Sequence, residues 1–301
     1  MPTGETQNLS LISDYKNIDK NRLSFNKLAG EVFGIDFEPW YKSGFWNERY
    51  VCYSYVADGA VVSNVSVNKM DLIINGVAKN ALQIGTVMTH PQYRKRGLSA
   101  SLMNIAPGEY ASKCDFIYLF AGESAYDFYP KFGFEEIRET SFAFEPELRG
   151  VKGPAMRSLD IGGEKDFEIL KRLSYNRTPV SKKFGVINCS HLTMFYCLLY
   201  YGKDIYYIDD IDTAVIYRIK DGSLYLYDIL SESDADTGAV LNALAKNMRA
   251  AGAGKIVFMF TPDRFELDIK GYKEEKEYKL FVKPGSGEIP DGFTVPRLSH
   301  A

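Results

Sequence analysis

Three positively charged side chains and a glycine stand together where a predicted strand gives way to a predicted helix. The segment is Arg94-Lys95-Arg96-Gly97, and it follows a β-rich run that ends at Thr89. The first N–H groups of a helix are unpaired and carry partial positive charge, which together with the cations suits a pyrophosphate. Gly97 allows close approach of the phosphates because it has no side chain. A solvated basic turn is the alternative, and the strand–turn–helix setting favours the phosphate site.

The rest of the chain does not share this positive charge. Its 301 residues include 36 Lys and Arg against 39 Asp and Glu, a net charge of −3, so we expect no nucleic-acid partner. No apolar run approaches the ~18 residues of a membrane span, and no signal peptide is recognisable, so we expect a cytoplasmic protein without a membrane partner. The 4 Cys and 3 His are scattered, which predicts free thiols and no metal site.

The sequence around the basic segment predicts an N-terminal helix followed by a meander of strands. Apolar residues at helical spacing predict a helix over 18–33, followed by a short aromatic helix or turn over 39–46. Alternating and β-branched residues, with Asp58-Gly59 and Asn75-Gly76 as hairpin turns, predict strands over 50–57, 60–67 and 70–89. Beyond the basic segment we predict a helix to about residue 112, a strand over 115–120, a helix over 124–131 and a last strand over 134–144.

The second half of the chain repeats part of this order without repeating the residues. We predict helices over 164–173, 191–201 and 237–251, and strands over 205–208, 213–219, 224–230 and 255–260. The Gly- and Pro-containing stretch 145–153 predicts a linker. We therefore expect two domains, 1–150 and 151–301, the second with an extended tail over 283–301. The helix over 191–201 is apolar all round, as a helix buried between two layers should be.

The basic segment and a second motif resemble the GNAT superfamily of N-acetyltransferases. Residues 94–99 are similar to that family's acyl-CoA loop, with Ser99 where Gly or Ala is usual, and residues 87–91 are similar to the strand before it. Residues 124–134, which end in Tyr-Pro-Lys-Phe-Gly-Phe, are similar to its next motif. The pieces occur in the family's order, and the resemblance covers roughly residues 10–145.

The resemblance implies a fold and a set of roles. The expected fold class is α+β: a mixed, largely antiparallel sheet with splayed strands, flanked by helices. Acetyl-CoA would enter the splay as the donor, and a primary amine would attack the thioester directly in a ternary complex. The resemblance implies Tyr129 as the acid for the leaving thiolate, with packing as its alternative role, and the N–H of Val87 or its neighbour as the oxyanion donor. The implied CoA-binding residues are Val87, Met88, Thr89, Arg94, Lys95, Arg96, Gly97, Leu98 and Ser99.

The general base is not identified by the sequence. The family often has a Glu on the strand before the loop, whereas this strand offers Gln83, Thr86 and Thr89. We expect His90 to be structural because it precedes a proline in a turn. Three carboxylates flank the helices near the acceptor side, and we expect each to lie at the surface: Asp36, Glu38 and Glu48. A chain of water molecules is the remaining alternative.

The second half lacks a counterpart of the basic loop. At the corresponding place stand residues 231–238, with three acidic side chains that would repel a diphosphate. We therefore expect a degenerate GNAT-like domain that binds no CoA. This tandem arrangement resembles the enhanced-intracellular-survival type of acetyltransferase, which adds a third domain and uses its terminal carboxylate in the active site. The sequence is too short for that third domain, so the role is not transferred to Ala301.

The sequence thus predicts an acetyl-CoA-dependent N-acetyltransferase. A small-molecule amine is favoured over a protein amine as acceptor, and a non-catalytic CoA-binding or regulatory module is the alternative because the base is missing. Aromatic residues from the 39–46 segment are candidates for walls of the acceptor pocket, although core packing is expected for most of them: Trp40, Tyr41, Phe45 and Trp46. Acceptor identity, acyl length and oligomeric state, including a homo-oligomer, stay open.

Overall fold

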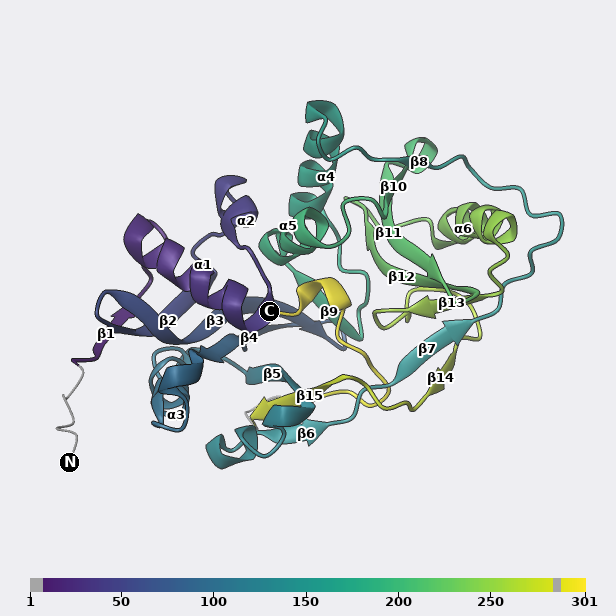
Figure 1. The fold of residues 1–301 in the computed structure, drawn as a ribbon. Coiled ribbons are helices and arrows are strands. Elements are labelled where there is room, and N and C mark those ends of the chain that lie inside the picture. The colour runs from purple at the N-terminus through teal and green to yellow at the C-terminus, as the bar shows by residue number, and fades with distance from the viewer. Residues whose placement is uncertain (1–7, 284–287) are drawn as a thin grey trace.

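Two sheets organise the part of the chain that the computed structural model describes, residues 8–283 and 288–301. Each sheet forms the centre of one lobe (Figure 1). The first sheet has the order β1–β2–β3–β4–β5–β15–β6, with β9 beside β3. Its strands are Ser10–Ser13 (β1), Tyr50–Ala57 (β2), Ala60–Ile74 (β3), Val77–Thr89 (β4), Phe116–Gly122 (β5), Glu135–Ile137 (β6), Phe184–Ile187 (β9) and Tyr278–Lys283 (β15).

The second sheet has the order β14–β7–β13–β12–β11–β10–β8. Pairing is mostly antiparallel, with parallel pairing of β12 and β13 here and of β4 and β5 in the first sheet. The α+β class and the mixed, largely antiparallel sheet are confirmed. The strands of the second sheet are Ser141–Phe144 (β7), Arg157–Ser158 (β8), Ile205–Ile208 (β10), Thr213–Lys220 (β11), Ser223–Leu230 (β12), Lys255–Phe258 (β13) and Lys270–Tyr272 (β14).

Turn chemistry explains the hairpins that were predicted. Asp58-Gly59 and Asn75-Gly76 each have two positive φ angles, 50° and 79° in the first pair and 49° and 78° in the second. Two consecutive residues with positive φ form the turn whose twist matches paired strands. These turns set the registers of β2 against β3 and of β3 against β4, which place the end of β4 at the site described below.

The α-helices flank these sheets and meet between them. Helix α1 ends at Gly34, whose left-handed φ of 70° closes it, and α2 follows directly. Helix α5 lies between α2 and α4, so it joins the two lobes (Figure 1). Among the described residues no helix is long and apolar enough to cross a membrane. The α-helices are Asp19–Phe33 (α1), Glu38–Lys42 (α2), Leu98–Ile105 (α3), Glu164–Asn176 (α4), Ser190–Leu199 (α5) and Thr237–Ala251 (α6).

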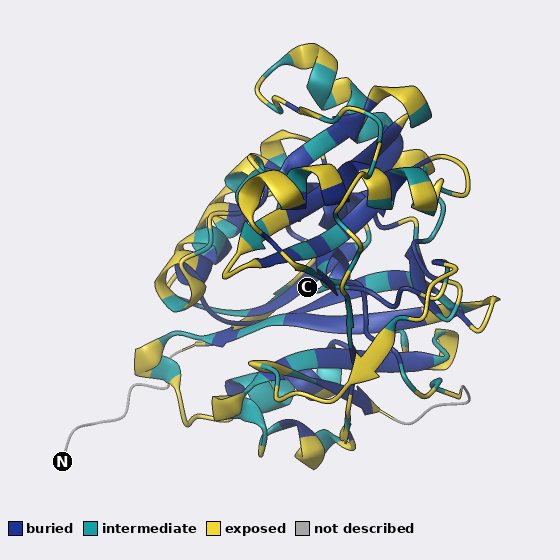
Figure 2. Cartoon of the chain, turned by 90° about the vertical axis from the view of Figure 1, so that its right-hand side faces the viewer, coloured by how far each residue is buried: buried dark blue, intermediate teal, exposed yellow. Residues whose placement is uncertain are grey.

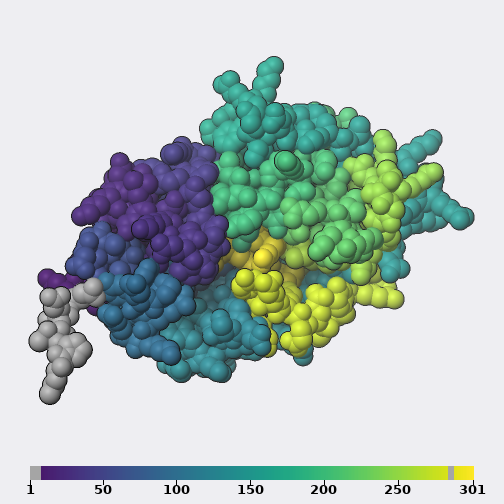
Figure 3. Space-filling model, in the orientation of Figure 1, coloured from purple at the N-terminus to yellow at the C-terminus, as the bar shows by residue number. Residues whose placement is uncertain are grey.

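The lobes exchange strands across residue 150. Strand β15, from the C-terminal half, lies between β5 and β6 in the first sheet, and β9 pairs with β3. Strand β7, from the N-terminal half, pairs with β13 and β14 in the second sheet. The C-terminal residues, yellow in Figure 3, accordingly lie between the N-terminal part and the green second lobe. The domain boundary at residue 150 stays a prediction. In each sheet, strands from before residue 150 are hydrogen-bonded to strands from after it.

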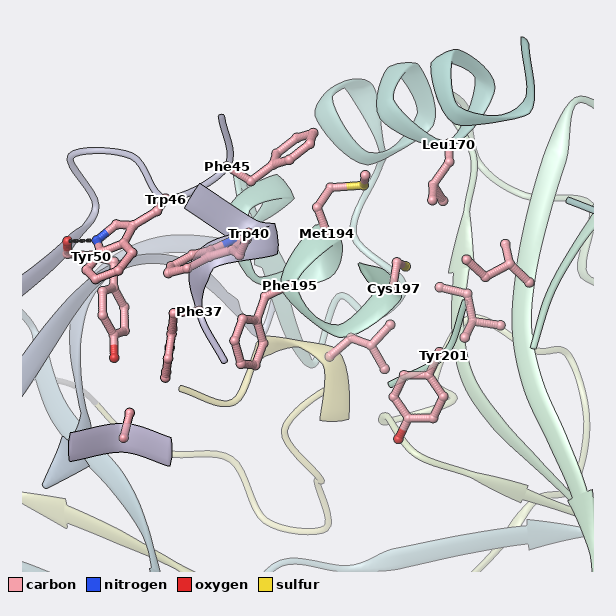
Figure 4. Packing of buried hydrophobic residues seen from close by; sticks show 14 of the residues in the cluster. Phe37, Trp40, Phe45, Trp46, Tyr50, Leu170, Met194, Phe195, Cys197 and Tyr201 are labelled. Atoms are coloured by element: carbon pink, nitrogen blue, oxygen red, sulfur yellow. Dashed lines mark hydrogen bonds between the residues drawn. The ribbon is translucent and has the colours of Figure 1, made fainter. Parts of the chain in front are cut away.

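The core between the lobes is built around α5. Seven of its residues are buried, and the dark blue of Figure 2 marks buried residues in the sheets and between the layers. Phe195 packs against Phe37 and Trp40, with ring centroids 5.4 Å apart in both pairs, while Met194 and Cys197 project from other sides of the helix (Figure 4). The predicted burial of this helix is confirmed, and one apolar cluster holds both lobes together.

Several predicted element bounds are wrong. Strands predicted over 60–67 and from 70 form one strand, β3, and the residues predicted as a last strand over 134–144 divide between β6 and β7 in different sheets. Helix α3 ends at Ile105, before Pro107, rather than near residue 112. The predicted helix over 124–131 is replaced by short 3₁₀ turns, Glu123–Ala125 (η3) and Tyr129–Phe132 (η4), because Pro130 lacks the N–H that an α-helix needs there.

Candidate active site

Strands β4 and β5 separate in the middle of the first sheet. Their parallel pairing runs from Ala81 opposite Phe116 to Ile84 opposite Leu119 and then stops. Beyond that point β4 continues along β3, while β5 continues along β15 as far as Gly122 opposite Tyr278. A cavity of about 630 Å³ opens where the strands diverge, lined on one side by Gly85, Thr86 and Val87 of β4.

A bulge in β4 shapes the edge of this opening. Thr86 and Val87 together face a single residue of β3, Val65, and Thr86 has a φ of 47°, which is rare for a β-branched residue. Asn64 holds the bulge by donating from Nδ2 to the Thr86 carbonyl oxygen at 2.8 Å, and the Thr86 hydroxyl is hydrogen-bonded to the Tyr50 hydroxyl. The strained backbone is therefore held by specific bonds, and the bulge exposes Thr86 and Val87 to the cavity.

The basic loop follows the end of β4. The chain passes through a 3₁₀ turn, Pro91–Tyr93 (η1), and then two left-handed residues, Lys95 with φ 63° and Gly97 with φ 77°. Gly97 is the N-cap of α3 and offers no side-chain cap, and a Cβ placed on it would meet no atom within 4 Å. The Thr89 and Ser99 hydroxyls, 2.6 Å apart, join the strand end to the first turn of α3.

The geometry of this loop suits anion binding. The N-terminus of α3 is open, and the predicted loop residues from Arg94 to Gly97 are exposed around it. Leu98 is buried, and so is Met88, so these two predicted residues offer main-chain groups rather than side chains. The open space above Gly97 fits a phosphate group, although the assignment of all nine predicted CoA-binding residues stays a prediction.

Tyr129 lies in η4 on the other side of the opening. Its ring packs against Phe128, Phe134 and Phe281, with centroids 5.2 to 6.3 Å apart, and its side chain lines the cavity. Burial raises the pKa of Tyr129 to about 12, so the phenol stays protonated at neutral pH. Among the described residues no hydrogen-bond partner holds its hydroxyl. The packing role and the proton-donor role are therefore compatible, since the ring is fixed while the hydroxyl is available.

Aromatic side chains form much of the cavity wall. They come from α1 and the segment through α2, from β2, from α5 and its C-terminal end, and from β15. Trp40 lines this wall and is fixed by its indole Nε1, which donates to the His191 carbonyl oxygen at 2.7 Å. Of the four aromatic residues predicted from the 39–46 segment, Trp40 alone lines the cavity. The aromatic set is Phe33, Phe37, Trp40, Tyr50, Phe195, Tyr196, Tyr200, Tyr201 and Tyr278.

The other predicted aromatic residues pack elsewhere. Phe45 and Trp46 are buried in the core between the lobes, and Trp46 stacks on Trp40 with ring centroids 5.5 Å apart. Tyr41 is covered by the Arg22 guanidinium, 3.8 Å from the ring centroid. Core packing is therefore the role that the structure gives to three of the four.

The C-terminal segment completes the cavity, and the sequence did not reveal this. A 3₁₀ turn, Arg297–Ser299 (η6), leads to His300, which stacks on Phe120 with centroids 3.6 Å apart, and to Ala301, which packs on Gly85. Arg297, His300 and Ala301 all line the cavity. The run of apolar residues from Phe293 to Leu298 was a signal that this tail packs, since Phe293, Val295 and Leu298 are buried.

None of the predicted acidic bases reaches the cavity. Glu38 accepts from Arg22 Nε at 2.9 Å, and Asp36 accepts from Asn26 Nδ2 at 2.7 Å. Glu48 is exposed away from the site. His90 accepts from the Gln92 N–H and faces Glu31, so it has the structural role that was expected. In the described part of the chain no Asp or Glu side chain lines the cavity.

The second lobe presents no comparable loop at its corresponding helix. The side chain of Asp236 caps α6 and accepts from the Ala239 N–H at 2.9 Å. Asp234 pairs with Arg264 beside it. A helix N-terminus that already holds a carboxylate repels a phosphate, in contrast to the open N-terminus of α3.

Comparison with known proteins supports the fold. Residues 18–137 match a family model described as an acetyltransferase (GNAT) domain. A probable N-acyltransferase from Enterococcus faecalis V583 has a similar structure, with a TM-score of 0.58 and 16% identity over 93% of this chain and 71% of that chain. A GCN5-related N-acetyltransferase from Kribbella flavida gives 0.58 and 19% identity over 92% of this chain and 71% of that chain.

Eis1 from Mycobacterium abscessus is similar as well, with a TM-score of 0.57 and 15% identity over 91% of this chain and 73% of that chain. These similarities extend over both lobes. At such low identity they show the fold alone, and they confirm the expected GNAT-like architecture of the whole chain. The sequence comparison with curated proteins gives no match.

Proposed function

Residues 18–137 belong to the GNAT acetyltransferase family, and on that premise we propose that the chain transfers an acetyl group from acetyl-CoA to a primary amine. The observation that carries the proposal is the separation of β4 from β5 at a cavity, next to a basic loop and an open helix N-terminus. Two proteins of similar structure, an N-acetyltransferase and a probable N-acyltransferase, support transfer to nitrogen.

The donor side would be formed by the loop and the end of β4. Arg94, Lys95 and Arg96 would face the pyrophosphate together with the N–H groups of α3, whose N-cap is Gly97. The main chain of residues 87–89 would pair with the pantetheine arm along the open edge of β4. Acetyl-CoA, when bound, supplies the thioester that the amine attacks.

Two groups would serve the chemical step. The N–H of Val87 or its neighbour, at the bulge, would donate to the oxygen of the carbonyl as negative charge develops there. The Tyr129 hydroxyl would donate its proton to the departing sulfur, which its raised pKa permits because the proton is present at neutral pH. The amine attacks directly, so we assign no nucleophile to the protein.

We assign no side-chain base either. The carboxylates that flank the site are engaged or exposed elsewhere, and the cavity lining in the described chain has no acidic side chain. His300 accepts at Nδ1 from the Arg297 guanidinium at 3.1 Å, so its ring proton lies on Nε2 and it has no lone pair available there. Water in the cavity is left to take the ammonium proton.

A small-molecule amine is the acceptor that we propose. The cavity is walled by segments from both lobes, and its volume of about 630 Å³ lies in the range of small-molecule pockets. We also propose that the protein works in the cytoplasm, which its free cysteines support. The second lobe would shape the acceptor side and bind no CoA.

The test is release of the CoA thiol from acetyl-CoA in the presence of a panel of primary amines, with calorimetry of acetyl-CoA binding alongside. Amine-dependent release supports the proposal. Tight acetyl-CoA binding without release from any amine would favour the non-catalytic CoA-binding alternative. Release with peptides but not with small amines would move the acceptor to a protein.

A further inference from the structure

The cavity has few charged side chains in its lining. Its lining in the described chain contains one charged side chain, Arg297, and no Asp or Glu side chain. Arg297 is partly exposed, and no acidic side chain among the described residues lies within ion-pair distance of it. A guanidinium in a largely apolar cavity is costly unless an anion pairs with it.

The position of Arg297 is fixed by its own segment. Its main-chain N–H donates to the Met259 carbonyl oxygen at 2.9 Å, and the Ser299 hydroxyl closes the turn on the Pro296 carbonyl oxygen at 2.6 Å. Leu298, next in sequence, is fully buried and anchors the turn in the core between the lobes. The main chain that carries the guanidinium is therefore held in place.

Most of the donors of Arg297 remain available. In the described part of the chain its side chain makes one hydrogen bond, from Nη1 to His300 Nδ1 at 3.1 Å, and its carbon Cζ lies 5.9 Å from the centre of the Tyr278 ring. A guanidinium has five N–H donors in a planar fork that matches a carboxylate. His300 itself is held by stacking on Phe120, so it keeps the orientation of the fork.

The positive charge of Arg297 affects the pKa values of tyrosines that line the cavity. Burial raises the pKa values of Tyr196 and Tyr200, that of Tyr196 to about 12, and the positive charge of Arg297 opposes the rise in both. The same opposition acts on the raised pKa of Tyr201. The cation and these tyrosines line the same cavity.

We propose that the acceptor is an amine that carries a carboxylate on an aromatic or other apolar body, and that Arg297 selects it by pairing with that carboxylate. This inference rests on the proposed function. The aromatic wall would hold the apolar body, because rings pack favourably edge-to-face or offset. The guanidinium would pair with the carboxylate by charge-assisted hydrogen bonds and would repel an acceptor with a second positive charge. The geometry makes Arg297, in the lining of the cavity, a specificity residue.

The experiment compares amines that share one ring. Benzylamine is the neutral-ring reference, para- and meta-(aminomethyl)benzoate add a carboxylate at two placements, and para-xylylenediamine adds a second ammonium. With the wild-type chain we expect kcat/KM for the better benzoate to exceed that for benzylamine by about 10- to 100-fold, the range of charge-assisted hydrogen bonds. The diamine should be the poorest after correction for its two equivalent amines.

Substitutions then identify the residue responsible. Arg297→Gln should lower kcat/KM for the benzoate far more than kcat/KM for benzylamine and so remove the advantage of the benzoate, and Arg297→Glu should make the diamine better than the benzoate. Arg218→Gln is the matched control, because Arg218 lies over Tyr201 but is paired with Asp204 outside the cavity. It should keep the wild-type order of acceptors.

Calorimetry of the same amines on the chain saturated with CoA separates this inference from the proposed function. Tighter binding of the benzoate, lost in Arg297→Gln, upholds the inference even if no amine is acetylated, in which case the proposed function fails alone. Equal use and equal binding of benzylamine and both benzoates would overturn it. An equal loss for all amines in Arg297→Gln would also overturn it, since that result indicates a structural role.

Discussion

Ala301 packs directly against Gly85: its main-chain carbon lies 2.7 Å, and its oxygen 3.0 Å, from the position that a Cβ on residue 85 would take. Gly85 is also the residue at which β4 leaves β5. The absence of a side chain at this point therefore lets the C-terminal segment reach the opening in the sheet. A residue from one end of the chain thus forms part of a site built on a strand near residue 85.

The substitution Gly85→Ala should disturb this contact. A Cβ that close to main-chain atoms forces β4 or Ala301 to move, which we expect to cost about 1–3 kcal/mol of stability and to lower acetyl transfer by about 100-fold through misplacement. Thermal unfolding and initial rates measure the two effects. Gly254→Ala is the control, since a Cβ there meets no atom within 4 Å. Unchanged stability and rate in Gly85→Ala would contradict the observed packing.

The donor loop is tested by Gly97→Asp. The new carboxylate would stand where a phosphate is proposed, in a residue whose φ of 77° already disfavours side chains. We expect acetyl-CoA affinity to fall by roughly 30- to 1000-fold, or about 2–4 kcal/mol, from charge repulsion in a partly desolvated site. Titration calorimetry measures it. Gly252→Asp, at the left-handed C-cap of α6, matches the strain and the charge and should leave affinity unchanged. Equal affinities in all three proteins would remove the loop from the donor site.

Tyr129→Phe separates proton donation from packing. The ring contacts survive the substitution, while the hydroxyl is lost, so turnover should fall by about 10²–10⁴ with little change in acetyl-CoA affinity. Because the pKa of Tyr129 is raised to about 12 by burial, this residue should cause no loss of kcat as pH rises from 7 to about 10. A loss of thermal stability without a defect in turnover would leave Tyr129 with a packing role alone.

Two histidines with lowered pKa values predict a loss of stability in acid. Burial lowers the pKa of His191 to about 3 and that of His300 well below its usual value, so both are neutral in the folded state. In the unfolded chain each histidine takes up a proton as the pH falls below about 6.5, so stability declines from there towards the folded pKa. At pH 5 the loss that His191 causes should be about 2 kcal/mol.

His191→Gln checks the assignment. His191 Nε2 lies 2.8 Å from the Asn68 Oδ1, and a glutamine amide can replace that donor without titrating. Denaturant unfolding between pH 7 and pH 5 should show a decline about 2 kcal/mol smaller in this variant than in the wild type. An identical pH dependence in the two proteins would show that His191 titrates normally.

Strand exchange predicts that residues 1–150 do not fold alone. They lack β15, which is hydrogen-bonded to both β5 and β6, and they expose the apolar surface that α5 covers. We expect this fragment to aggregate when expressed by itself and to become soluble when residues 151–301 are co-expressed. Light scattering of the purified material measures the difference. A monodisperse, active fragment would show that the second lobe contributes nothing to the first.

Local chemistry explains what the sequence predicted well. The hairpin turns at Asp58-Gly59 and Asn75-Gly76, the bounds of β2 and β4 and the span of α6 follow from turn residues and periodicity, which are properties of neighbouring residues. Polar residues inside β3 are the reason that two separate strands were predicted where the structure has one. Asn68 is fully buried, yet its polarity is satisfied by His191, a residue of α5 that no local pattern connects to it.

The strand partners and cavity residues that come from distant parts of the chain could not be predicted from the sequence. No strand was predicted over 278–283. No local pattern there indicates that β15 pairs with β5 and β6, more than 130 residues earlier in the chain. The same limit applied to the site. The loop at residues 94–99 could be predicted because it carries a local motif, whereas Arg297, His300 and Ala301 line the cavity only through tertiary packing. The helix predicted over 124–131 does not form because Pro130 lacks the main-chain N–H that an α-helix needs there.

Direct acetyl transfer is tested most directly by mass spectrometry after incubation of the chain with acetyl-CoA and para-(aminomethyl)benzoate. We expect one acetyl group on the amine nitrogen, no acetyl group retained on the protein, and much slower product formation by Gly97→Asp under subsaturating acetyl-CoA. A stable acetylated protein, or no acetylated product from this or any other amine while acetyl-CoA binds, would contradict direct acetyl transfer in this site.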